Sequence, residues 1–112
     1  MYDPNLHPPI TIPPGGCPQA KGDTVTLTVD DSGITPRCVT VRLSQQLVVV
    51  NDGQQFHNVT IQDLSANLDV GDAQPYGRIG RYFIPGMYSI HSQTEPDISL
   101  DPGFYGTLVV VK

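Results

Sequence analysis

The sequence predicts an all-β fold, a Greek-key β-sandwich of seven to eight strands. Charged residues make up only 15% of the chain, and 11 glycines and 11 prolines interrupt its 112 residues. Valine, threonine and isoleucine recur in short runs between them, a mixture that favours many short strands joined by tight turns. A chain of this length forms one domain, which can bury its own core without a metal.

The chain begins with a proline-rich stretch, residues 1–22, which we expect to be an extended segment that precedes a domain at residues 23–112. Its prolines disfavour a helix and leave few backbone donors for a sheet. Such a segment is typical of a linker or tether, for example between an upstream membrane anchor and a domain.

The two cysteines favour a disulfide. Cys17 precedes the first expected strand and Cys38 opens the second, so antiparallel pairing would bring them close together. The bridge would close a loop of about 20 residues. The alternative is two unrelated buried thiols. A disulfide would indicate an extracytoplasmic protein, either periplasmic, on the cell surface or secreted.

Hydrophobic periodicity predicts the first four strands. Residues 23–30 and 38–43 alternate with period two, which is typical of half-buried strands. The continuous apolar run at residues 47–50 predicts a central strand covered on both faces. After a strong turn signal at Asp52-Gly53, residues 56–61 form the next expected strand.

The second half of the chain is less regular. We expect a short helical turn at residues 64–68, a loop at 69–80 and a short edge strand at 81–84. The final two strands are expected at residues 87–91 and 105–111, because a Pro-Gly turn precedes the first and a Gly-bounded loop the second.

Three features of the chain together resemble the cupredoxins, a family of small blue-copper electron carriers. They are Asn51 followed by His57, the Pro85-Gly86-Met87-Tyr88 turn, and the Gly106-Thr107-Leu108-Val109-Val110 strand. The resemblance covers about residues 24–111. It implies a β-sandwich in which His57 is the first copper ligand.

The resemblance also implies where the other three copper ligands would lie. Ser92 stands at the cysteine position, Glu95 at the second histidine and Phe104 at the methionine. A blue copper site takes a thiolate, two imidazoles and a weak axial thioether. Serine is not ionised at neutral pH and phenylalanine has no donor atom. The sequence therefore predicts a degenerate type 1 site and a binding or structural module without a cofactor.

Two further interpretations of the histidines stay open. His57 is either a structural remnant, hydrogen-bonded at the end of the sandwich, or a ligand with Glu95 and Ser92 of a non-blue copper(II) site in copper handling or electron transfer. His91 precedes Ser92, and neighbouring side chains of a strand point to opposite faces. We therefore expect His91 to face solvent, with a metal-ligand role as the less favoured alternative.

Charge excludes several partners. The net charge is −5, and the six Lys and Arg residues are scattered along the sequence. Nucleic acids and anionic membranes are bound by concentrated positive charge, so neither is expected, and a membrane contact would come only from an upstream anchor. No catalytic motif indicates an enzyme.

A protein partner of unknown identity is the expected ligand. Loops at residues 93–104 and 69–82 are the candidate contact surfaces, where Tyr76, Tyr82 and Phe104 are expected to be partly exposed. Exposed edge strands allow either a monomer or a weak dimer.

Overall fold

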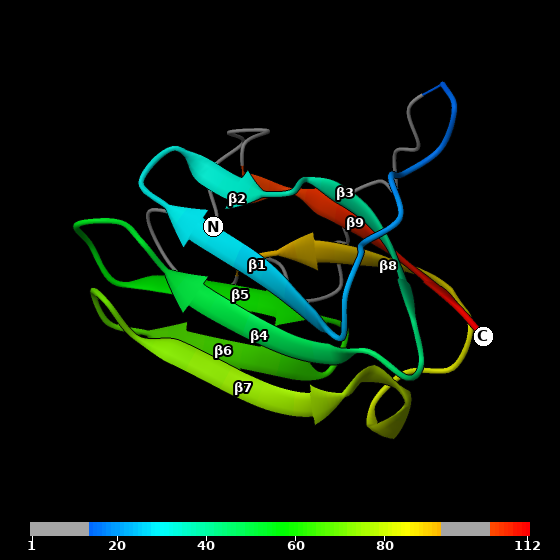
Figure 1. Cartoon of the computed structure of the whole chain (residues 1–112). Coiled ribbons are helices and arrows are strands. Elements are labelled where there is room, and N and C mark those ends of the chain that lie inside the picture. The colour runs from blue at the N-terminus through cyan, green and yellow to red at the C-terminus, as the bar shows by residue number, and fades with distance from the viewer. Residues whose placement is uncertain (1–13, 93–103) are drawn as a thin grey trace.

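The computed structural model describes residues 14–92 and 104–112, which form two packed β-sheets (Figure 1). The four-stranded sheet has the order β2-β1-β4-β7. Its strands are β1 (Thr24–Asp30), β2 (Gly33–Thr35), β4 (Gln46–Asn51) and β7 (Ala73–Arg78). The five-stranded sheet has the order β3-β9-β8-β5-β6. Its strands are β3 (Cys38–Arg42), β5 (His57–Ile61), β6 (Leu64–Leu68), β8 (Gly86–His91) and β9 (Gly106–Val111).

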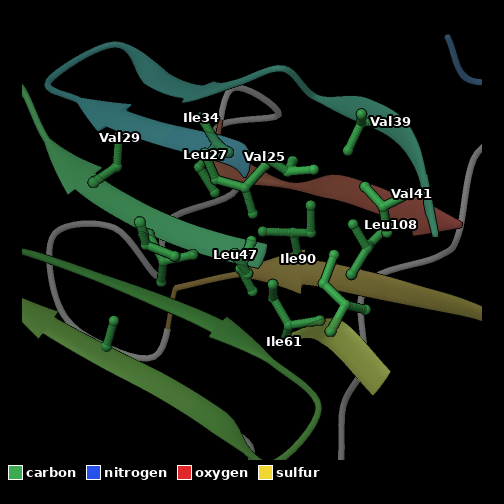
Figure 2. Packing of buried hydrophobic residues seen from close by; sticks show 14 of the residues in the cluster. Val25, Leu27, Val29, Ile34, Val39, Val41, Leu47, Ile61, Ile90 and Leu108 are labelled. Carbon is green, nitrogen blue, oxygen red and sulfur yellow. The ribbon is translucent and has the colours of Figure 1, made fainter. Parts of the chain in front are cut away.

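The predicted all-β sandwich is confirmed, with nine strands in the described residues against the seven or eight expected. The core lies between the two sheets and takes side chains from both (Figure 2). Leu27, Leu47, Ile90 and Leu108 are each 0% exposed at its centre. No helix in the described part of the chain is long and apolar enough to cross a membrane.

Strand β4 differs from the expectation that it is covered on both faces. Its residues alternate between half-buried and buried, so that Leu47 and Val49 point into the core while Val48 and Val50 are only partly covered. The strand lies beside β1 in parallel, with Thr26 opposite Val48. A continuous apolar run therefore does not mark a doubly covered strand here.

Three expectations for the second half are wrong. Residues 64–68 form strand β6 instead of a helical turn, and residues 73–78 form strand β7 within the expected loop. The expected edge strand at 81–84 is absent, because the chain turns there after a short 3₁₀ helix, η1 (Ile79–Arg81). Strand pairing explains the first two, since β6 pairs along β5 and β7 along β4.

The predicted disulfide between Cys17 and Cys38 is present, with 5.0 Å between the two Cα atoms. The expected antiparallel arrangement is wrong, because Gln19 pairs with Thr40 in parallel. The Ala20 N–H donates to the Thr40 carbonyl at 2.8 Å, and the Thr40 N–H donates to the Pro18 carbonyl at 2.9 Å. The end of the proline-rich stretch thus covers the edge of β3.

Gln45 connects this covering segment to the sheet. Its side chain is 2% exposed, and its Oε1 accepts from the Arg42 N–H at 2.8 Å. Its Nε2 donates to the carbonyls of Ala20 at 3.2 Å and Gly22 at 2.8 Å. The division at residue 22 stays a prediction, although these contacts attach the described residues from Cys17 onward to the domain.

Candidate functional site

The candidate site lies at the end of the sandwich where the chain leaves β1 and β4 and enters β5, at the left in Figure 1. Asn51, which is 1% exposed, organises this end. Its Nδ2 donates to the carbonyls of Gln55 at 2.8 Å and Leu68 at 3.0 Å, and its Oδ1 accepts from the Gly53 N–H at 2.9 Å. These bonds fix the loop that leads into His57.

His57 is buried at this end, with 1% of its side chain exposed. Its Nε2 lies 2.8 Å from Oδ1 of Asp31, in the turn between β1 and β2. Its ring stacks on Phe104, with 5.7 Å between ring centroids and 30° between planes. Phe104 is 6% exposed, so the expectation that it is partly exposed is wrong.

Asp31 is the partner of His57, a pairing that the sequence does not predict. Its carboxylate also accepts the Gln54 N–H, at 3.1 Å to Oδ1 and 3.0 Å to Oδ2. A Cβ on Gly53 would lie 2.5 Å from Oδ1 of Asp31, so only glycine allows this approach. In the sequence, Asp31 is recognisable only as a turn residue. Nothing near that turn predicts an interaction with a histidine 26 residues later in the chain.

The hydrogen bond from His57 is the main cause that lowers the pKa of Asp31 below its ordinary value of 3.8. The Gln54 N–H lowers this pKa further, while partial desolvation acts in the opposite direction. Because the folded-state pKa is depressed, the carboxylate contributes stability above its unfolded-state pKa, and this contribution is lost as the pH falls through the folded-state value.

We expect Asp31→Asn to destabilise the protein at neutral pH and to have progressively less effect below about pH 4, where the unfolded-state aspartate becomes protonated. Urea denaturation of both proteins over a pH series measures this difference. Asp63→Asn, in the turn at the opposite end of β5, is the control. A destabilisation by Asp31→Asn that is the same at every pH would contradict the role of the charged carboxylate.

His91 occupies the expected face but not the expected environment. It lies opposite Thr60 of β5, on the outer face of the five-stranded sheet, while Ile90 and Ile61 point into the core. It is 6% exposed, so the prediction of a solvent-facing histidine is wrong. The physical reason is that β5 is buried at all five positions, so this part of the outer face is covered as well.

His57 and His91 are not brought together. His57 shares the core face of β5 with Val59 and Ile61, because alternate side chains of a strand point the same way. His91 lies on the other face beside Thr60. Ser92, at the cysteine position of the resemblance, is buried at 3% exposure.

Other predicted oxygen donors lie in residues 93–103, outside the described residues, and among them is Glu95. Its place beside His57 stays a prediction. Within residues 14–92 and 104–112, no three or more His, Cys, Asp and Glu side chains form a group that could hold a metal ion. The described part of the site therefore offers one imidazole and one carboxylate, those of His57 and Asp31.

This donor set does not fit a type 1 copper. Such a site takes a cysteine thiolate, two imidazoles and a thioether. The sequence has two cysteines, Cys17 and Cys38, and both are in the disulfide. Met87 is 56% exposed at the start of β8, whereas Phe104 packs on the ring of His57.

Three solved structures with the same fold are distant from this chain in sequence. Auracyanin from Roseiflexus castenholzii aligns with a TM-score of 0.64 at 14% identity, over 83% of this chain and 100% of that chain. A purple cupredoxin from Nitrosopumilus maritimus gives 0.57 at 14%, over 77% and 98%. A reduced copper(I) form of an amicyanin variant gives 0.57 at 13%, over 82% and 86%.

Neither the protein-family models nor the curated proteins include a match to this sequence. Identities of 13–14% establish a shared fold and nothing finer. The two packed sheets of this chain and its alignment over the full length of auracyanin both support that fold. The chain is a cupredoxin-like β-sandwich.

Proposed function

We propose that this chain is a cupredoxin-like binding module that lacks a type 1 copper and acts through contacts of its surface with a protein partner. The observation that supports this most strongly is the Cys17–Cys38 disulfide, since it holds both cysteines of the sequence. A bridged cysteine has no thiolate to give to copper, and the thiolate is the ligand on which blue copper chemistry depends.

The end of the sandwich that carries His57 offers a contact surface. Phe56 is 42% exposed in the loop before His57, and Val70 is 53% exposed in the hairpin between β6 and β7. Asn51 joins these two loops through its bonds to Gln55 and Leu68. Apolar side chains on loops held by a rigid sheet are suited to binding a partner.

A non-blue copper(II) site is the second candidate function, favoured by the pair of His57 and Asp31. Nε2 of His57 and Oδ1 of Asp31 lie 2.8 Å apart, which is close enough for one metal ion to coordinate both atoms. Copper and zinc both accept imidazole nitrogen and carboxylate oxygen as ligands. Glu95 is the proposed further ligand. A site of this kind would serve copper handling or electron transfer, and we propose no enzymatic activity for either function.

Titration of the metal-stripped protein with copper(II) tests both functions. Electron paramagnetic resonance and visible absorption follow the titration, with His57→Ala and His91→Ala as a matched pair of variants. The proposed binding module gives no stoichiometric copper binding. The second candidate gives one bound ion that is lost in His57→Ala and kept in His91→Ala, because His91 lies on the other face of the sheet.

One spectrum would overturn the proposed absence of type 1 copper. An intense visible band, as a copper–thiolate bond produces, would mean that a cysteine coordinates copper. The double variant Cys17→Ser with Cys38→Ser must then remove the band.

The disulfide also supports an extracytoplasmic location, since such bonds persist in oxidising compartments.

A further inference from the structure

The fold gathers most of the basic side chains at one end of the sandwich, opposite His57 and at the right in Figure 1. Five of the six Lys and Arg residues belong to this basic end: Lys21, Arg42, Arg78, Arg81 and Lys112. In the sequence these residues are scattered, which is why no concentrated positive charge was expected. They are far apart along the chain, but the turns and strand ends that carry them meet in space.

Backbone hydrogen bonds show that this end is continuous. The Leu43 N–H donates to the Val111 carbonyl at 3.1 Å, and the Gly80 N–H donates to the Leu43 carbonyl at 2.9 Å. The start of β1 joins them, because the Gln46 N–H donates to the Asp23 carbonyl at 2.7 Å. The turn after β3 thus connects the beginning of β1, the end of β7 and the end of β9.

Charge is separated along the molecule. All five side chains of the basic end are exposed, and the only described Asp or Glu side chains at this end are those of Asp23 and Asp63. Arg78 lies 3.6 Å from Asp23, the one ion pair within the described residues of this end. The opposite end carries the other described carboxylates, which are Asp30, Asp31, Asp52, Asp69 and Asp72.

An apolar patch adjoins the basic end. Ile84 is 75% exposed in the connection before β8, Met87 is 56% exposed on β8, and Val111 is 36% exposed on β9. Arg42 stands beside Val111 in the ladder between β3 and β9. Tyr82, 42% exposed, lies in the same connection as Ile84. The two most exposed large apolar side chains of the described residues, Ile84 and Met87, therefore lie near the basic end.

We propose that the basic end docks onto an anionic lipid bilayer, with Ile84 and Met87 entering the interface between headgroups and acyl chains. Exposed aliphatic side chains flanked by Lys and Arg bind such a surface by burying apolar area and by attracting its negative charge. Tyrosine is suited to the same boundary, since its ring is apolar and its hydroxyl polar. This docking does not depend on His57 or on copper.

A second copy of the chain fits the basic end less well. Its acidic end would complement the charge, but a head-to-tail contact between opposite ends leaves the basic end of the last copy unpaired and adds further copies unless the rotation closes a ring. A bilayer presents a continuous negatively charged surface that all five basic side chains can face at once.

Co-sedimentation with vesicles tests the proposal on the full chain. Vesicles of phosphatidylglycerol mixed with phosphatidylcholine are expected to bind the protein at low salt, whereas pure phosphatidylcholine vesicles are not. Arg42→Gln with Arg81→Gln should weaken binding by more than about tenfold, because each basic residue near an anionic surface adds attraction. Ile84→Ser should weaken it as well, by removing the most exposed apolar side chain.

Two matched variants at the opposite end are the controls. Arg37→Gln removes the one basic side chain outside the basic end, and Val70→Ser removes an apolar side chain that is 53% exposed. Both are expected to bind vesicles as the unmodified protein does. The proposal is overturned if no vesicle binds, if the controls weaken binding as much as Ile84→Ser, or if analytical ultracentrifugation shows salt-sensitive self-association that depends on Arg42 in the absence of lipid.

Discussion

Loss of the Cys17–Cys38 disulfide is expected to lower the free energy of unfolding by about 3 kcal/mol. The two cysteines are 21 residues apart, and in the chain-entropy model a bridge over such a loop restricts mainly the unfolded chain. The double variant Cys17→Ala with Cys38→Ala provides the comparison, and urea denaturation at neutral pH gives the difference in free energy.

Reduction of the unmodified protein with an excess of a dithiol is the control for this prediction, because it opens the bridge without changing the sequence. It should lower the urea midpoint as much as the double variant does. Hydrogen exchange at the Ala20 and Thr40 amides should accelerate in both, since these amides hold the covering segment on β3. Equal midpoints for oxidised protein and double variant would contradict a stabilising disulfide.

Ile90→Ala is expected to lower the free energy of unfolding by about 3 kcal/mol, within the 2–5 kcal/mol typical of truncating a buried isoleucine. Ile90 is 0% exposed and lies near Ile61 in the core (Figure 2). In the sheet it pairs with Ile61 of β5 and Gly106 of β9. The cost combines lost apolar burial with the cavity that the rigid strands leave behind. Chemical denaturation measures it.

Met87→Ala on the same strand is the matched control. Met87 is 56% exposed, so its truncation should change the unfolding free energy by no more than about 0.5 kcal/mol. If the two variants were equally destabilised, the centre of the core would not lie at β8 as the structure has it.

The strands that sequence reasoning found are those in which local preference and tertiary environment agree. In β1, Val25, Leu27 and Val29 are buried and the threonines between them face outward, which is the alternation visible in the sequence. Strands β3, β5, β8 and β9 likewise lie within a residue or two of their expected ranges. In all of these, β-branched residues reinforce the pattern.

Strands β6 and β7 could not be found because their local preferences oppose the structure. In β6, Leu64 and Leu68 have the spacing of a helical face, yet Ala66 between them is buried too, as period two requires. In β7, Pro75 and Gly77 are typical of loops. An edge strand tolerates proline at an irregularity, and the register of β7 against β4 shifts between Leu47 and Val48.

The candidate site was predictable only in part. The resemblance placed His57 and Phe104 in one region, and the structure stacks their rings. The partner of His57 could not be predicted, because Asp31 comes from a different loop and only the fold brings them within 2.8 Å. The burial of His91 could not be predicted either. The alternation of side chains along a strand predicts on which face of the sheet a residue lies, but not whether that face is covered.

The position of β9 between β3 and β8 has a consequence for the order of folding. Cys38 pairs with Thr107, 69 positions later, so β3 has no neighbour in its own sheet until the last strand is available. On the ribosome, Gly106–Val111 must therefore emerge before the five-stranded sheet can close. Contacts at such long separation fold slowly, and until β9 has emerged the segment from Cys17 to Ala20 is the partner that the described residues offer to β3.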